Sequence, residues 1–194
     1  MKFDIKNKTV EAKIVFYGPA LSGKTTSLKY LFKKFGKIEK IKSINSTTGR
    51  TLFFYFGILK FKGIKWEVKF LIYSTTGQDF YYVTRPTTIR GADGIIFVAD
   101  SNFNSFQRNI YSWNELTSMY GNVLNRIPIV CNFNKQDLAR KFDFQDFLKY
   151  IQHNKFKSFA YFKTTAILGD GVLSSFRKII EMIFPGVLVN QVMI

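Results

Sequence analysis

A glycine-rich stretch at residues 18–25 limits the folds open to this chain more than any other part of its sequence. It reads Gly-Pro-Ala-Leu-Ser-Gly-Lys-Thr, follows an apolar run at 13–17 and leads into a helix-compatible segment at 24–35. This spacing between a strand and a helix is the Walker A pattern, in which glycines let consecutive N–H groups face phosphate oxygens at a helix amino terminus. The pattern predicts a nucleotide phosphate site built from Gly18, Pro19, Ala20, Leu21, Ser22, Gly23, Lys24, Thr25 and Thr26.

Two side chains of this loop have specific expected roles. The Lys24 ammonium would neutralise the β and γ phosphates and assist catalysis, and the Thr25 hydroxyl would ligate Mg²⁺. The alternative, a glycine-rich turn with a structural role only, is disfavoured because a pattern this specific seldom arises by accident directly after a strand.

Apolar and helix-like segments alternate along the rest of the chain, without an internal repeat or a low-complexity linker. Strands are expected at 13–17, 94–99, 127–131 and 160–164, and a hairpin of longer strands at 51–61 and 65–73 around Lys62-Gly63. Helices are expected at 24–35, 104–120, 143–154 and 172–183, the last ended by Pro185 and Gly186. We predict one α/β domain over residues 1–194: a mostly parallel six-stranded sheet with one antiparallel edge strand and helices on both faces.

A second loop would read the base. Residues 132–137, Asn-Phe-Asn-Lys-Gln-Asp, follow the expected strand at 127–131 and contain the Asn-Lys-x-Asp pattern typical of GTPases. The Asp137 carboxylate can accept two hydrogen bonds from guanine, which adenine cannot donate. Lys135 would lie along the base, and Asn134 would join this loop to the phosphate loop. Thr165 and Ala166 stand where GTPases contact the base through main-chain N–H groups, although a plain threonine-rich turn is an open alternative.

Two further segments would sense the γ-phosphate. Residues 46–51 precede the second expected strand of the chain, and residues 74–78, Ser-Thr-Thr-Gly-Gln, follow the third. The Gly77 N–H would bond the γ-phosphate, and Gln78 would orient an attacking water. Most Ras-like proteins carry an aspartate, bonded to the metal's water, where this chain has Ser74.

The whole chain resembles the MglA family of prokaryotic Ras-like GTPases over roughly residues 9–184. Residues 17–28, 50–54, 77–81 and 91–101 carry the likeness, and a small hydroxyl residue at position 74 is usual in that family. The resemblance implies that Thr51, or alternatively Thr48, binds Mg²⁺ and that Arg50 acts in cis on the transition state. It further implies a roadblock-type regulatory protein and effector proteins as partners, in motility or cell polarity.

Two positions depart from the family. Tyr55 stands where an acid is usual, and Ala20 stands where glycine is frequent. The expected function is a small GTPase that binds GTP and GDP with Mg²⁺, hydrolyses GTP slowly and works as a switch. Two alternatives remain open: a GTP-dependent binding module with little hydrolysis, and an Arf-like or signal-recognition-receptor-like trafficking GTPase.

The charge of the chain has three possible origins. The formal net charge is +16, and six lysines between residues 29 and 42 are opposed there by Glu39 alone. Composition bias is the first reading, peripheral contact with an anionic membrane or partner the second, and nucleic acid the least favoured. No apolar stretch reaches the roughly 18 residues that cross a bilayer, and the single Cys131 lies in an apolar run. A cytoplasmic protein with a buried thiol is expected.

Overall fold

The computed structural model describes residues 1–44, 54–62, 66–75 and 85–185. Its strands are β1 (Lys2–Asp4), β2 (Thr9–Tyr17), β3 (Lys42–Ile44), β4 (Phe54–Lys62), β5 (Glu67–Thr75), β6 (Gly94–Asp100), β7 (Ile129–Asn134) and β8 (Phe159–Thr164). Its α-helices are α1 (Lys24–Lys34), α2 (Arg85–Ile89), α3 (Phe106–Tyr120), α4 (Phe144–Tyr150) and α5 (Val172–Ile183). Short 3₁₀ turns occur at Ile38–Lys40, Phe103–Ser105, Gly121–Arg126 and His153–Lys155.

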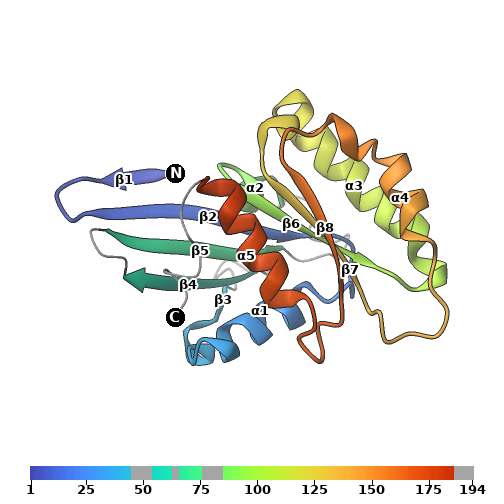
Figure 1. Cartoon of the computed structure of the whole chain (residues 1–194), viewed down its shortest axis with the longest axis horizontal. Coiled ribbons are helices and arrows are strands. Elements are labelled where there is room, and N and C mark those ends of the chain that lie inside the picture. Colours follow the sequence, from blue (N-terminus) through green and yellow to red (C-terminus); the bar gives the residue numbers. More distant parts are fainter. Residues whose placement is uncertain (45–53, 63–65, 76–84, 186–194) are drawn as a thin grey trace.

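The strands of the described residues form one sheet in the order β3-β4-β5-β2-β6-β7-β8, with β1 paired to the amino-terminal part of β2 (Figure 1). Strands β5, β2, β6, β7 and β8 run parallel, and β4 is antiparallel to β5. The predicted α/β class, mostly parallel with an antiparallel strand, is therefore confirmed. In addition to the six expected strands, the sheet contains β1 and β3, which have three residues each. Strands this short are too brief to show an alternation of apolar and polar residues, so they cannot be predicted from the sequence.

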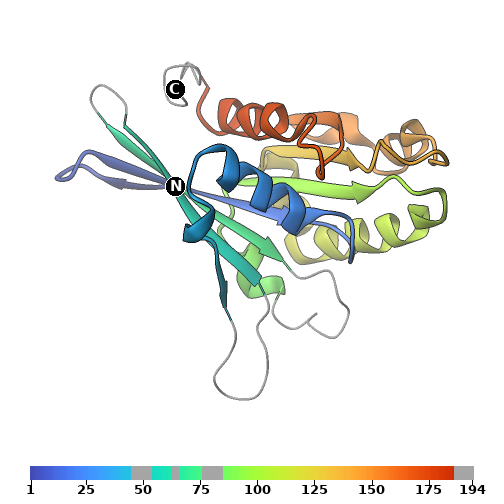
Figure 2. The ribbon, with the colours of Figure 1, turned by 90° about the horizontal axis from the view of Figure 1, so that it is seen from below.

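Helices cover both faces of the sheet (Figure 2). On one face, α1 and α5 pack over the sheet through Leu28, Leu31 and Phe32 and through the apolar stripe of α5. On the other face, α3 and α4 contribute Trp113 and Phe147. The central strand β6 is buried along its whole length, as expected for a parallel strand with helices on both sides.

Several predicted boundaries differ from the observed ones. Strand β7 runs to Asn134 rather than to Cys131, because it stays paired with β6 and β8 through its polar end. Strand β2 begins at Thr9, four residues earlier than expected, because β1 and β5 pair with it there. The predicted helix at 143–154 consists of α4 and a separate 3₁₀ turn. Cys131 is fully buried, as predicted.

Within the part of the chain that the structure describes, no helix combines the length and the apolar character needed to cross a bilayer.

Candidate functional site

The phosphate loop connects the end of β2 to the start of α1. Gly18 and Gly23 hold φ angles of +136° and +102°, a region that residues with a side chain rarely adopt. A Cβ at Gly18 would lie 2.3 Å from the Val98 carbonyl oxygen, and one at Gly23 would lie 2.1 Å from Nδ2 of Asn134. The fold itself therefore requires glycine at both positions of the motif.

The loop presents a row of unpaired main-chain donors. The first helical N–H with a backbone acceptor belongs to Ser27, which donates to the Gly23 carbonyl oxygen at 2.9 Å. Among the described residues, the N–H groups of residues 23–26 have no such acceptor. Unpaired N–H groups at a helix amino terminus, with the helix dipole behind them, attract anions. The loop therefore has the geometry of a phosphate site.

Lys24 is folded back onto this loop. Its Nζ donates to the carbonyl oxygens of Gly18 at 2.8 Å and Pro19 at 2.6 Å. Burial, and to a smaller extent the charge of Arg85, lower the pKa of Lys24 from 10.5 to about 7, while Glu115 opposes the shift. A phosphate placed beside Nζ would favour the charged ammonium and raise this pKa.

A cluster of buried polar groups lies close to Lys24. The Tyr17 hydroxyl donates to Oε2 of Glu115 at 2.6 Å, and Nη1 of Arg85 donates to the same oxygen. Burial first, and then Glu115, raise the pKa of Tyr17. The cluster joins β2, the start of α2 and the middle of α3. The sequence gives no signal for it, because its three members are isolated residues with no motif around them.

Asn134 joins the phosphate loop to the loops that would hold the base. Its Nδ2 donates to the Ser22 carbonyl oxygen at 2.7 Å. Its Oδ1 accepts from Thr164 Oγ1 at 3.1 Å and from the Ala166 N–H at 2.8 Å. One buried amide thus connects three segments that lie far apart in the sequence, after β2, β7 and β8.

Lys135 and Asp137 both come after β7, and their surroundings differ. Lys135 adopts a positive φ of 69°, and its Nζ donates to Oδ2 of Asp100 at 2.8 Å. Asp100, whose side chain is 2% exposed, ends β6 and also accepts from the Asn102 N–H. Asp137 is exposed, and its carboxylate makes no hydrogen bond or ion pair with any described residue. Asp100 was missed by sequence reasoning, although its place at the carboxyl end of a buried strand is a usable signal.

The loop after β8 is already hydrogen-bonded within the protein. The Thr165 N–H donates to the Asp170 carbonyl oxygen at 3.0 Å, and the Ala166 N–H is taken by Asn134. In this conformation neither group is free for a base. The expected main-chain contact of this loop with the base would require the Ala166 N–H to exchange Asn134 for the base or to be shared between them.

The residues that would hold a metal are only partly described. Thr25 is half-buried at the start of α1, and its hydroxyl makes no hydrogen bond with a described residue. Ser74, near the end of β5, is paired in register with Phe16 and Tyr55, and its buried Oγ has no partner among the described residues. A buried hydroxyl of this kind fits a site that holds an ordered water. No group of three His, Cys, Asp or Glu residues able to hold a metal occurs in the described ranges.

Several predicted residues lie outside the described ranges: Thr48, Arg50, Thr51, Gly77 and Gln78. Tyr55 is described, half-buried in β4, with the Nζ of Lys29 5.8 Å from the centre of its ring. A tyrosine ring in place of an acid therefore meets a lysine of α1 by a cation–π contact.

Comparisons with known proteins identify the relatives of this chain. The model of the Ras family matches residues 13–184. Mutual gliding-motility protein MglA of Myxococcus xanthus (strain DK1622) is 33% identical over 183 residues, which cover 91% of this chain and 92% of that protein. Ras-related protein RABF2b of Arabidopsis thaliana is 32% identical over 151 residues, 76% of this chain and 70% of that protein. DnaJ homolog subfamily C member 27 of Danio rerio is 26% identical over 183 residues, 91% of this chain and 62% of that protein.

The family model spans nearly the whole α/β domain, and the MglA alignment covers nine-tenths of both chains. This chain therefore belongs to the Ras family of small GTPases and is MglA-like.

Proposed function

We propose that this chain is a molecular switch that binds GTP and GDP with Mg²⁺ and hydrolyses GTP slowly, within a single domain. The observation that carries the proposal is the Asn134 side chain, which bonds the phosphate loop at 2.7 Å and the loop after β8 at 2.8 Å. These bonds hold the phosphate loop beside the end of β7, three residues before the exposed Asp137, and we infer that the donor row of residues 23–26 and Asp137 belong to one site. A nucleotide that bridges a phosphate cradle and a carboxylate fits that site.

The base would be selected by Asp137. Guanine offers the N1–H and the exocyclic amine as two donors to one carboxylate, whereas adenine would leave the charge unpaired. The Lys135 ammonium is held by Asp100, which would leave the aliphatic part of the side chain to cover the base.

The phosphates would be held by the main-chain N–H groups and by Lys24. Thr25 and Thr51 would hold Mg²⁺, which neutralises charge on the β and γ phosphates when it is bound. The Gly77 N–H would bond the γ-phosphate, Gln78 would orient the attacking water, and Arg50 would stabilise charge on the transferred group. Loss of the γ-phosphate would change the loops around Thr51 and Gln78, and with them the affinity for partners.

Competition binding tests the nucleotide assignment. GDP and GTP should displace a fluorescent guanine nucleotide at low concentration, whereas ATP should compete far more weakly. The assignment fails if ATP competes within about tenfold of GTP, a gap of only about 1.4 kcal/mol.

The second candidate is a GTP-dependent binding module that barely hydrolyses. Three residues favour it: Ser74 in place of the usual aspartate, Tyr55 in place of an acid, and Ala20 beside the space that Gln78 and Arg50 would share. Single-turnover hydrolysis separates the candidates, because a module would retain GTP with no measurable product over many hours.

The partners would be a roadblock-type regulatory protein and effectors that recognise the GTP form. The name of the Myxococcus relative refers to gliding motility, and a role in motility or polarity is our proposal for this chain. Affinity capture with a Gln78→Leu variant loaded with GTP, compared with the GDP form, would identify such partners. Equal capture by both forms would argue against a switch. The trafficking alternative would instead predict nucleotide-dependent recruitment to vesicles.

A further inference from the structure

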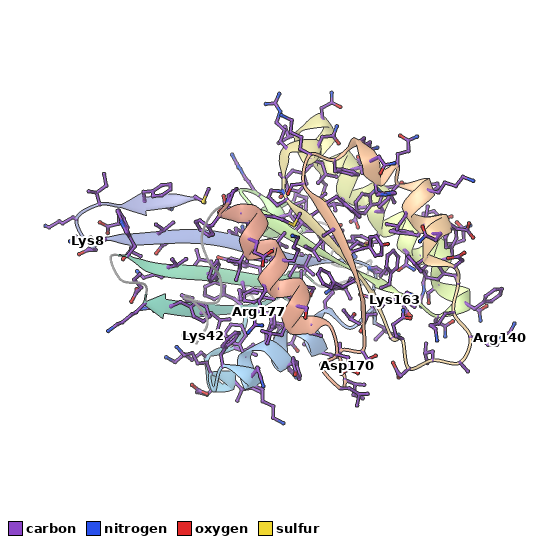
Figure 3. All side chains as sticks on the ribbon, in the orientation of Figure 1. Lys8, Lys42, Arg140, Lys163, Asp170 and Arg177 are labelled. Carbon is purple, nitrogen blue, oxygen red and sulfur yellow. The ribbon has the colours of Figure 1, made fainter. Side chains whose placement is uncertain are left out.

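The amino-terminal end of β2 projects away from the helices. Strands β4, β5, β2 and β1 lie abreast there, with Lys62 paired to Glu67, Glu67 to Thr9, and Thr9 to Asp4. The β1–β2 hairpin extends beyond the helical layers in both views (Figures 1 and 2). In Figure 3, Lys8 marks this end and Arg140 lies at the opposite end of the molecule. The phosphate loop follows the other end of β2, roughly 30 Å away at 3.3 Å per residue.

This hairpin tip exposes large apolar side chains. We define the tip by Phe3, Ile5, Lys6, Lys8, Lys62 and Trp66. Phe3 is 65% exposed, Ile5 80% and Trp66 36%. The Glu67 N–H donates to the Lys8 carbonyl oxygen at 2.8 Å, which places Trp66 beside the β1–β2 turn. Three apolar side chains therefore share one projecting end of the sheet.

The turn that carries Ile5 and Lys6 is held by hydrogen bonds. Asp4 accepts from the Asn7 N–H at 3.0 Å and from Asn7 Nδ2 at 2.7 Å. Lys8 adopts a left-handed φ of 49°, and its N–H donates to the Ile5 carbonyl oxygen at 3.3 Å. The exposed Ile5 is thus presented by a defined turn.

The charge around these side chains is positive. Lys2, Lys6, Lys8 and Lys62 are exposed and form no ion pair with any described residue. Of the acidic groups nearby, Glu11 and Glu67 lie 3.6 and 3.9 Å from the Nζ of Lys69, while Asp4 bonds the neutral Asn7 and keeps its charge. Two residues before Lys62, Lys60 lines a hollow of about 360 Å³ together with Lys37, Lys40 and Lys42, and Glu39 is the one acidic residue among its described lining. The positive surface therefore continues from the tip along the edge of β4.

We propose that the hairpin tip is a membrane-docking site that inserts Phe3, Ile5 and Trp66 into the interface of an anionic lipid bilayer. Apolar side chains on a projecting turn, ringed by lysines, match a bilayer interface, where tryptophan is favoured and lysine meets anionic headgroups. Docking by this end would leave the nucleotide loops facing away from the membrane. The proposal goes beyond the nucleotide switch and does not depend on it.

Trp66 supplies a direct probe. The chain has two tryptophans, and the other, Trp113, is buried in the core. With vesicles of phosphatidylcholine containing about one third phosphatidylglycerol, the GDP-loaded full chain should bind, and brominated acyl chains should quench its fluorescence. The Trp66→Phe variant should lose this quenching, because Trp113 is shielded. Quenching that persists in Trp66→Phe, or no binding to the anionic vesicles, would overturn the proposal.

Matched variants separate the tip from the overall charge. Lys6→Glu/Lys8→Glu should weaken vesicle co-sedimentation by about tenfold or more, whereas Lys149→Glu/Lys157→Glu, with the same charge change at exposed positions elsewhere, should weaken it far less.

Phe3→Ser/Ile5→Ser should weaken binding and abolish bromine quenching, while Tyr111→Ser/Val123→Ser, at exposed apolar positions of α3 and the turn after it, should do neither. Unchanged GDP affinity in all four variants would verify folding. Equal losses in tip and control variants, or wild-type binding to neutral phosphatidylcholine vesicles as strong as to anionic ones, would contradict the proposal.

Discussion

Gly23 illustrates how tightly a single residue is constrained at the site. It caps α1 with a φ of +102°, and a methyl group there would meet Asn134, the side chain that joins the loops. A substitution at this position should therefore disturb the phosphate loop and the base loop together.

We expect Gly23→Ala to lower nucleotide affinity by at least a hundredfold and to lower the unfolding free energy by about 1–3 kcal/mol. The affinity is measured by nucleotide displacement and the stability by urea unfolding. Gly36→Ala is the matched control, because Gly36 also has a positive φ but a Cβ there would meet nothing within 4 Å. Equal losses of nucleotide affinity and of stability in the two variants would show that Gly23→Ala acts through backbone strain alone.

Asp137 can be tested by changing the donors and acceptors that it presents. Asp137→Asn should shift preference from GTP toward xanthosine triphosphate, because xanthine offers an acceptor where guanine has its amine. The expected change in the ratio of the two dissociation constants is about a hundredfold or more, as for a lost charge-assisted pair. Equal loss of both nucleotides, without a shift in preference, would remove Asp137 from base recognition.

Lys24 should couple nucleotide binding to protons. In the free protein its pKa is lowered from 10.5 to about 7 by burial, so between these values the unfolded chain holds a proton that the folded chain lacks. The stability of the nucleotide-free protein should therefore rise with pH across this window. A bound phosphate raises the pKa again, so binding near pH 8 should take up close to one proton.

Calorimetric titration with GDP in buffers of different ionisation enthalpy measures that uptake. Lys24→Arg is the control, since arginine stays charged in both states. Proton uptake of the same size in Lys24→Arg would assign the coupling to another group.

At the scale of elements, the contact that joins β2, α2 and α3 through Glu115 was not predicted from the sequence. Arg85 begins α2 directly after residues 76–84, which include Gly77 and Gln78, and its guanidinium is held by a carboxylate of α3. The position of α2 therefore depends on a buried charged contact.

Glu115→Gln should lower the unfolding free energy by about 3 kcal/mol, because it removes the carboxylate that faces the buried Arg85. Tyr17→Phe, which removes a hydrogen bond to the same oxygen and keeps the charge, should cost only about 1 kcal/mol. Chemical denaturation gives both values. Losses of equal size would show that Glu115 acts through packing rather than charge.

At the scale of the whole molecule, the rate of GTP hydrolysis is the property to test. We expect slow intrinsic turnover, on the order of 10⁻⁴ to 10⁻² s⁻¹, the range of Ras-like enzymes without and with a built-in arginine. With an activating regulator, Arg50→Ala and Gln78→Leu should each lower hydrolysis by about a hundredfold or more and leave GDP affinity nearly unchanged. Phosphate release in single turnovers is the measurement. A loss confined to Gln78→Leu would rule out the arginine in cis.

The sequence determined the parts of this protein that depend on local patterns. The Walker A spacing predicted a turn between a strand and a helix, and the period of α5 predicted its buried face, because phosphate loops and amphipathic helices are encoded by neighbouring residues. Both elements stand where they were expected, with α5 at Val172–Ile183. The alternation of apolar runs and helices similarly determined the α/β class.

Only the tertiary structure decided which distant groups meet. Strand β1 exists because β2 offers it a partner, and Asp100 meets Lys135 because parallel strands end at one edge of the sheet. Asn134 reaches Ser22 and Ala166 for the same reason. Such contacts depend on strand order and register, which arise when the whole core packs, so no local segment of the sequence encodes them. The exposed hairpin tip is likewise a product of the sheet, since its apolar side chains come from segments about sixty residues apart.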